Sequence, residues 1–284
     1  MAIKGKHPTT NKQAPSNGKL SLAGSDFVFI EEPRLQTNAV IFGVNGQGKT
    51  TTVTEYCPEP IAFISLDRRG ERAVDKAKKK GRTIAFLKVD TPVNPTKLDD
   101  TALRKVGQTA LNQIIKNFEW AVNQSLRGNI KTIGMDTGTE YAEIVNFAVT
   151  GRADRVKGDY GKSKDLINRE FWRLYNLARE GNAHFVMLAR AQEIWIANEP
   201  TGTFKPRGPD VISDAADWCG NIRLKRRSKG RAKKEFELEI TKAGVNIDEL
   251  GEVYDEEAWG DMGPFGFASW MQFIDTSERK DWKW

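Results

Sequence analysis

Short apolar runs alternate with longer amphipathic stretches over most of the chain. Apolar runs of strand length occur at residues 38–44, 61–66, 83–89, 131–135 and 184–189. Stretches that suit helices lie between them, at residues 49–56, 69–80, 98–126, 139–150 and 165–180. Strands separated by helices predict an α/β fold with a mostly parallel sheet and helices on both faces. In such sheets, ligands bind beyond the carboxyl ends of the strands.

The pattern changes after these elements. Residues 221–227 and 235–241 alternate between apolar and polar positions, which predicts a late basic strand pair with its turn at residues 228–230. Two polar, glycine-containing stretches, residues 152–164 and 198–209, are expected to form loops.

Composition divides the chain into three parts. Residues 1–24 contain four lysines, no acid and few apolar residues, which predicts a flexible basic tail. Such a tail either contacts nucleic acid or is plain disordered chain. Residues 25–245 hold the alternating pattern and are expected to form the core. Residues 246–284 form an extension that is first acidic and then aromatic.

Several classes of protein are excluded by hydropathy, cysteine and histidine content. No apolar stretch approaches the roughly 18 residues of a membrane-spanning helix, and no apolar signal segment is seen. Cys57 and Cys219 give no disulfide framework, and His7 and His184 are too few for a histidine-based zinc site. A cytoplasmic protein is expected.

One motif predicts a ligand. Residues 43–50 read Gly-Val-Asn-Gly-Gln-Gly-Lys-Thr and match the phosphate-binding loop at every required position, between an expected strand and an expected helix. Backbone N–H groups cradle the phosphates, Lys49 reaches the outer phosphates, and the Thr50 hydroxyl binds Mg²⁺. The motif therefore predicts Mg²⁺-dependent ATP binding. The residues expected to contact the nucleotide are Gly43, Asn45, Gly46, Gln47, Gly48, Lys49, Thr50 and Thr51.

Polar residues near other strand ends are candidates for the remaining chemistry. Asp136 follows a strand and is expected to hold the metal, or otherwise to cap the next helix. Asp67 is a candidate for activating the attacking water, with Glu71 and Glu140 as competitors. Gln192 is a candidate sensor that bridges the γ-phosphate and a mobile loop, or else a plain loop residue.

The formal net charge is +6, and its distribution favours a polyanionic partner. Residues 225–234 carry seven basic side chains, whereas residues 248–261 carry seven acidic ones and no basic one. Basic side chains that neutralise phosphates bind nucleic acid in a salt-dependent way. The alternatives are a solvated hairpin, or an acceptor for the acidic segment in the same or a neighbouring molecule. The residues expected to contact DNA are Lys205, Arg207, Lys225, Arg226, Arg227, Lys229 and Arg231.

These residues together resemble a known family. The phosphate loop, Asp67, Asp136-Thr137, the Asp-Tyr-Gly at 159–161 and the basic strand around 223–226 are similar to phage-encoded RecA-like P-loop ATPases of the single-strand annealing recombinase type. The resemblance covers about residues 36–245. It implies a RecA-like core, ATP, Mg²⁺ and single-stranded DNA, with a single-stranded DNA-binding protein as a further partner in the host bacterial cytoplasm.

The resemblance also implies self-assembly into a ring or filament, with ATP between neighbouring subunits. Lys242 occupies the place from which a basic residue reaches the neighbour's γ-phosphate, although it can equally be a solvated strand-end lysine. The catalytic set expected from the sequence is Lys49, Asp67, Gln192 and Lys242.

Other functions share part of these motifs. A helicase or DNA-packaging motor would use the same loop and Asp136 but would unwind or translocate DNA. A small-molecule kinase would need an arginine-rich lid, for which Arg152 and Arg155 are the candidates. A nucleotide-gated assembly protein would have no DNA role. ATPase activity with and without single-stranded DNA, at two salt concentrations, best separates these classes.

Overall fold

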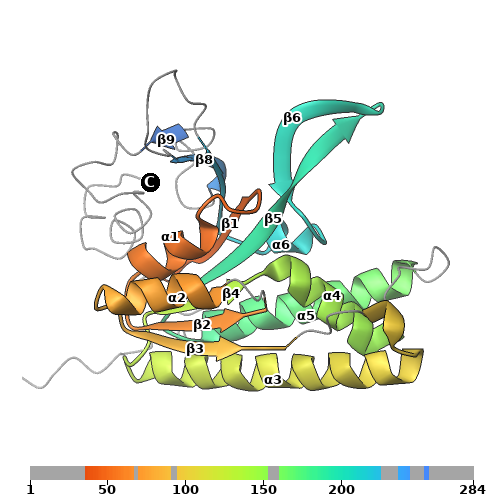
Figure 1. Ribbon diagram of the computed structural model, residues 1–284, viewed down its shortest axis with the longest axis horizontal. Coiled ribbons are helices and arrows are strands. Elements are labelled where there is room, and N and C mark those ends of the chain that lie inside the picture. The colour runs from red at the N-terminus through yellow and green to blue at the C-terminus, as the bar shows by residue number, and fades with distance from the viewer. Residues whose placement is uncertain are drawn as a thin grey trace, which may run out of the picture. The chain divides into compact units, whose positions relative to one another are not determined.

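A nine-stranded sheet organises the residues that the computed structural model describes, which are 36–66, 70–90, 95–152, 160–224, 236–243 and 253–255. The strands are β1 (Asn38–Gly43), β2 (Ile61–Ser65), β3 (Ile84–Lys88), β4 (Thr132–Asp136), β5 (His184–Ile196), β6 (Glu199–Pro206), β7 (Trp218–Leu224), β8 (Phe236–Ala243) and β9 (Val253–Asp255). Their order is β3-β2-β4-β5-β1-β7-β8-β9, and β6 pairs with β5 (Figure 1).

The centre of the sheet is parallel. β1 pairs in parallel with β5 and β7, and β2 pairs in parallel with β3 and β4. Every residue of β1, β2 and β4 is buried, as expected for parallel strands that are covered on both faces. Only the pairings of β5 with β6, β7 with β8 and β8 with β9 are antiparallel among the described strands. The prediction of a mostly parallel α/β sheet with a late strand pair is confirmed.

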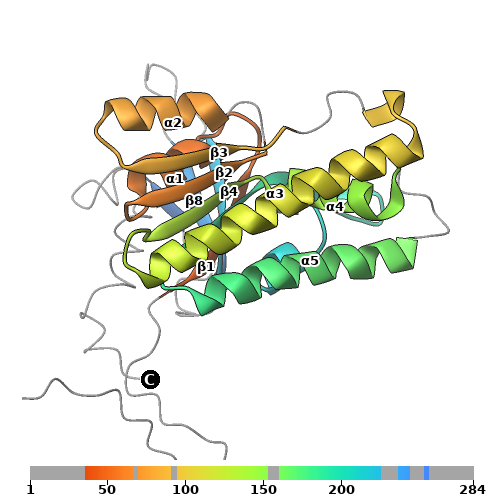
Figure 2. The same cartoon turned by 90° about the horizontal axis from the view of Figure 1, so that it is seen from below.

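Helices cover both faces of this sheet. α1 (Lys49–Tyr56) and α2 (Gly70–Lys79) lie on one face, whereas α3 (Asp100–Leu126), α4 (Gly138–Thr150) and α5 (Tyr160–Glu180) lie on the other (Figures 1 and 2). Two apolar cores result, one on each face. Two short elements, η1 (Pro95–Lys97) and α6 (Val211–Asp214), complete the described helices.

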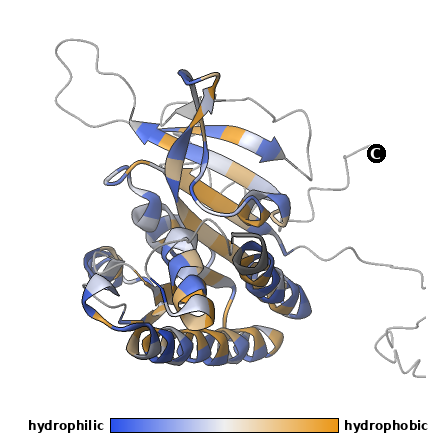
Figure 3. Cartoon of the chain, turned by 90° about the vertical axis from the view of Figure 1, so that its right-hand side faces the viewer, coloured by the Kyte–Doolittle hydropathy of each residue, from blue (hydrophilic) through white to orange (hydrophobic). Residues whose placement is uncertain are grey.

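α3 shows why the helical pattern of the sequence is reliable. The Asp99 side chain accepts a 2.8 Å hydrogen bond from the Ala102 N–H, which caps the helix as expected for an aspartate at this position. Ile114, Ile115 and Phe118 follow at helical spacing and are buried against the sheet. The outer faces of the helices are hydrophilic (Figure 3).

The predicted loop at residues 198–209 is wrong over most of its length. β5 continues to Ile196, and β6 returns along it through a turn at Ala197 and Asn198, whose φ angles are 50° and 67°. The β-forming residues 194–196 favour extension of the strand. The prolines of residues 199–206 are tolerated because β6 pairs on one side only. The result is a hairpin that projects from the sheet (Figure 1).

The predicted loop at residues 152–164 is wrong at its end, because α5 already begins at Tyr160. Glycine at position 161 weakens helix propensity but does not prevent a helix that packs its later turns against the core.

Several predictions lie outside the described residues. They concern the 1–24 tail, Asp67, residues 225–234 and most of the 246–284 extension, of which β9 is the described part. Within the described ranges, no helix has the length and apolarity needed to cross a bilayer.

Candidate functional site

The phosphate loop joins β1 to α1 at the carboxyl edge of the sheet. Gly46 and Gly48 have φ angles of 81° and 84°, a region that residues with a side chain rarely enter. Gly43 is needed for close approach, because a Cβ atom there would lie 2.3 Å from a backbone carbonyl oxygen of β7. Gln47 Oε1 accepts a 3.0 Å hydrogen bond from the Val44 N–H and so closes the loop.

Lys49 lies within this loop. Its Nζ donates hydrogen bonds of 2.8 Å to the Gly43 carbonyl oxygen and 3.0 Å to that of Val44, and only 7% of the residue is exposed. Phosphate oxygens are charged and make stronger hydrogen bonds with an ammonium group than neutral carbonyls do. A bound polyphosphate therefore competes well for this side chain.

Thr50 and Asp136 are brought together although 86 positions separate them. The Thr50 hydroxyl donates a 2.8 Å hydrogen bond to Asp136 Oδ2, and Asp136 is 3% exposed at the end of β4. A hydroxyl and a carboxylate supply the oxygen ligands that Mg²⁺ prefers. The two residues predicted to hold the metal therefore fit it in chemistry and in position.

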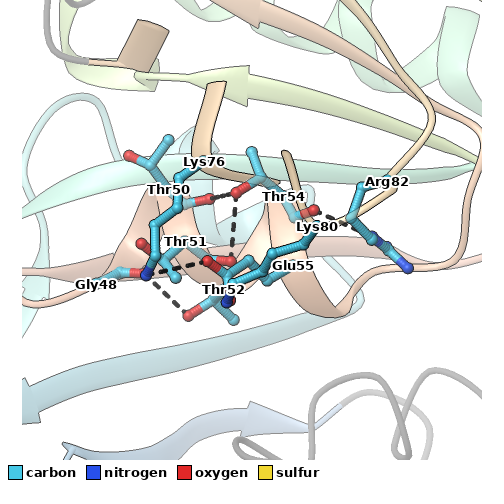
Figure 4. A network of polar contacts seen from close by, with 9 residues as sticks. All are labelled: Gly48, Thr50, Thr51, Thr52, Thr54, Glu55, Lys76, Lys80 and Arg82. Carbon is cyan, nitrogen blue, oxygen red and sulfur yellow. Dashed lines mark hydrogen bonds and ion pairs between the residues drawn. The ribbon is translucent and has the colours of Figure 1, made fainter. Parts of the chain in front are cut away.

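α1 is held firmly behind the loop (Figure 4). The Thr52 hydroxyl donates to the Gly48 carbonyl oxygen at 3.1 Å, and the Thr54 hydroxyl donates to that of Thr50 at 3.0 Å. Threonine hydroxyls inside a helix commonly bond back to the preceding turn in this way. The loop thus begins a helix whose first turn has additional hydrogen bonds.

Glu55 ties α1 to α2. Its carboxylate forms an ion pair of 3.3 Å with Lys76 and a shorter one with Lys80, and its side chain is 6% exposed. Burial of Glu55 raises its pKa, but the hydrogen bonds and positive charges of Lys80 and Lys76 outweigh burial and bring the pKa below its ordinary value. The charged form of Glu55 is therefore stabilised in the folded protein.

Two of the three candidate acids can be placed. Glu71 lies in the first turn of α2 and pairs with Lys88 at 3.2 Å. Glu140 lies in the first turn of α4, where its carboxylate contacts both the Thr137 hydroxyl and the Arg190 guanidinium. The part of the chain that is described does not include Asp67.

Arg190 is a site residue that sequence reasoning missed. It lies in β5 opposite Gly43 of β1, and its guanidinium forms an ion pair with Glu140. Its backbone N–H donates a 3.3 Å hydrogen bond to the Thr139 hydroxyl. The available signal was a charged residue directly after the buried run 184–189.

A phosphate sensor was expected directly beside the phosphate loop. Gln192 instead lies on the projecting hairpin, two residues beyond Arg190, which is opposite Gly43. It is exposed and opposite Lys205 of β6. Lys205 pairs with Asp210 at 3.1 Å, and the Arg207 side chain is exposed. Arg207 also anchors the hairpin, because its N–H donates to the Arg190 carbonyl oxygen at 2.6 Å. The sensor and DNA-contact roles of these residues stay predictions.

Lys242 lies at the amino ends of the parallel strands, whereas the phosphate loop lies at their carboxyl ends. It is opposite Cys219 in β7, which is itself opposite Val40 near the start of β1. Its Nζ donates hydrogen bonds of 2.8 Å and 3.0 Å to the carbonyl oxygens of Ser213 and Asp214 in α6. Lys242 therefore does not contribute to the site of its own chain, and its action on a neighbour stays a prediction.

The predicted DNA-binding residues of 225–231 lie outside the described residues, but their flanking strands are placed. β7 ends at Leu224 and β8 begins at Phe236, both beyond the level at which β1 enters the phosphate loop. The connection between these strands thus leaves and returns at the nucleotide edge of the sheet.

Comparison with known proteins agrees with this site. A family model described as AAA domain matches residues 36–243, which span β1 to β8. No curated protein matches the chain. Because the matched residues make up well over half of the sequence and contain the phosphate loop, Thr50 and Asp136, the chain belongs to the AAA domain family of P-loop ATPases.

Proposed function

We propose that this P-loop ATPase is a Mg²⁺-dependent DNA recombination protein that binds single-stranded DNA and promotes annealing or strand pairing. The observation that carries the nucleotide part is the 2.8 Å hydrogen bond between Thr50 and Asp136 beside the buried Lys49. The DNA part is supported by the position of the basic elements, because the β5–β6 hairpin and the 225–235 connection both start from the nucleotide edge.

In this proposal the loop residues bind and orient the triphosphate. The N–H groups of residues 46–51 and the Lys49 ammonium hold the phosphates, and Thr50 with Asp136 holds the metal. Mg²⁺ supplies Lewis-acid stabilisation of the charge that develops on the phosphoryl oxygens. Arg190 lies opposite Gly43 at this edge, where its guanidinium is paired with Glu140.

DNA binding is assigned to phosphate contacts. Lys205 and Arg207 on the hairpin join the basic residues of 225–231, and such contacts give affinity that falls with salt. Self-assembly is part of the proposal: Lys242 lies far from the phosphate loop of its own chain, so a catalytic role for Lys242 would require the ATP of a neighbouring subunit.

The proposal is tested by ATP hydrolysis with and without single-stranded DNA, at two salt concentrations. We expect stimulation by DNA that weakens at the higher salt concentration. Equal turnover with and without DNA, together with no salt-dependent DNA binding, would contradict the DNA role and leave only the ATPase activity. Strand unwinding under the same conditions would favour a motor instead.

A further inference from the structure

An apolar groove lies at the β3 edge of the sheet, away from the nucleotide site. It has a volume of about 270 Å³ and is bounded by β2, β3 and α3. Phe86 and Leu87 of β3 and Trp120 of α3 are among its lining residues, and Trp120 is 48% exposed. An aromatic side chain this exposed at the rim of an apolar groove is typical of a binding surface.

The strand beside this groove is open to pairing. β3 is the last strand of the sheet, and no described strand pairs with its outer edge. Ala85 and Lys88 of β3 are exposed. An edge strand next to an apolar groove suits an extended peptide that adds backbone hydrogen bonds and inserts alternate side chains.

Positive charge flanks the same edge. The end of α2 and the residue after it supply Lys76, Lys78, Lys79 and Lys80, and Gly81–Thr83 then lead directly into β3. Lys76 and Lys80 pair with Glu55, yet their side chains remain 64% and 51% exposed. The groove thus favours a ligand that has both aromatic and acidic residues.

One segment of this chain has that composition. Residues 248–261 carry seven acids and no base, and Phe265, Phe267 and Trp270 follow within the next nine positions. Neither the nucleotide chemistry nor the DNA contacts make use of this segment. The acidic residues of this segment precede its aromatic residues. In the same order, the lysines at the end of α2 precede β3, which lines the groove.

The two ends of the sheet indicate which molecule supplies the segment. β9, which lies within the acidic part of this segment, and β3 are the outermost of eight strands, which places them roughly 34 Å apart across seven spacings of about 4.8 Å. The ten residues from Asp255 to Phe265 reach roughly 35 Å only as a straight, extended chain. Helices cover both faces along that line. A neighbouring molecule placed edge to edge avoids this path.

We propose that the groove between β3 and α3 binds the 262–274 segment of a second copy of this chain, with the preceding acidic residues against the lysines at the end of α2. The contact is heterologous, because groove and segment are different surfaces, and it therefore links subunits head to tail. This interface goes beyond the ATPase and DNA roles proposed above.

Photo-cross-linking from the groove tests the proposal in the full chain. p-Benzoylphenylalanine replaces Trp120 in one protein and the exposed Ala85 in another, and the captured peptide is identified by mass spectrometry. A one-to-one mixture of ¹⁵N-labelled and unlabelled chains separates links between copies from links within one. We expect mixed-isotope links to residues 262–274. p-Benzoylphenylalanine at Trp172, which is 41% exposed on α5 outside the groove, is the matched control.

Other capture results would overturn the proposal. These are links within one chain, links to the apolar residues 27–30 or to the basic run 225–234, equal capture from position 172, and no capture from either groove position.

Self-association provides a second measurement. Phe265→Ala, Phe267→Ala and Trp270→Ala together are expected to weaken association roughly tenfold or more, because each buried aromatic side chain contributes to binding. Trp282→Ala with Trp284→Ala is the control within the same extension. Sedimentation velocity measures the difference, and equal effects of the two variants, or a parent chain that does not associate, would overturn the interface.

ATP affinity is measured in parallel, and we expect it to be unchanged in the Phe265, Phe267 and Trp270 variant. Failure of the interface would thus leave the nucleotide function intact, and failure of ATP binding in the parent chain would leave the interface intact.

Discussion

The phosphate loop and the β5–β6 hairpin start at the same sheet edge, opposite each other at Gly43 and Arg190, but they are held in different ways. Lys49 in the loop is buried and hydrogen-bonded to loop carbonyls. The hairpin is anchored at its base, while Trp195 and Ile196 at its tip are 60% and 67% exposed. The phosphate loop is therefore pre-organised by contacts within its own chain. The exposed apolar side chains at the hairpin tip can instead be covered by another molecule.

The largest expected effect comes from the loop. Lys49→Ala should weaken ATP binding at least about 100-fold, or roughly 3 kcal/mol, because no other loop side chain carries a positive charge. Titration with a fluorescent ATP analogue measures it. Lys105→Ala on the exposed face of α3 is the control and should bind normally. Unchanged affinity in a folded Lys49→Ala protein would contradict the assignment of the site.

Asp136→Asn should separate hydrolysis from binding at the same site. We expect kcat to fall about 100-fold because the metal loses a charged ligand, with ATP affinity changed less than about tenfold. Steady-state hydrolysis at saturating Mg²⁺ gives the comparison. Glu143→Gln, an exposed acid of α4, should be normal. If the control loses activity and Asp136→Asn keeps it, the metal carboxylate has been misplaced.

The stabilisation that Glu55 gives to α1, the helix after the phosphate loop, is expected to depend on pH. Because the pKa of Glu55 is lowered on folding, its stabilisation is complete above its unfolded pKa and is lost as pH falls through the folded pKa. Glu55→Gln should cost about 1–3 kcal/mol at pH 7. Urea unfolding of parent and variant should give different midpoints at pH 7, and the midpoints should converge as the pH falls through the folded pKa of Glu55.

An exposed ion pair is the control for the effect of burying the Glu55 ion pairs. Asp75→Asn removes an exposed ion pair with Lys79 and should cost at most about 0.5 kcal/mol. A difference in midpoint between Glu55→Gln and its parent that stays equally large as the pH is lowered would show that shape, and not charge, sets the effect.

The hairpin should show the smallest effect on nucleotide and a measurable one on DNA. Lys205→Ala with Arg207→Ala should leave ATP affinity unchanged and lower the log–log salt slope of single-stranded DNA binding by about 1.4, at roughly 0.7 for each lost phosphate contact. Fluorescence anisotropy over a salt series measures the slope, with Lys97→Ala as the control. An unaltered slope would shift the DNA surface to residues 225–231.

The sequence was sufficient where local pattern decides structure. The buried runs of β1, β2 and β4 are read as strands because both faces of a parallel strand are apolar. The helix at residues 49–56 was predicted at its observed bounds, since the phosphate loop precedes it and Pro58 follows it. The loop glycines could be named because their motif encodes a backbone requirement.

Local pattern failed where distant residues decide. Glu140 and Arg190 are 50 positions apart, and nothing in either segment announces their ion pair. The hairpin was missed because prolines and a glycine in residues 199–206 are typical of loops, and only the pairing with β5 makes a strand of them. The strand position of Lys242 can be read from the sequence, whereas its hydrogen bonds to carbonyl oxygens of α6 depend on how the chain returns across the sheet.

The hydrogen bond between Thr50 and Asp136 joins the two oxygen groups that would hold the metal. A divalent ion arriving alone would have to displace this bond and would gain few protein ligands in exchange. A metal that arrives already coordinated by a triphosphate brings oxygen ligands with it, and the loop N–H groups stabilise the anion at the same time. In the proposed function, the nucleotide would therefore serve as the carrier of its own cofactor.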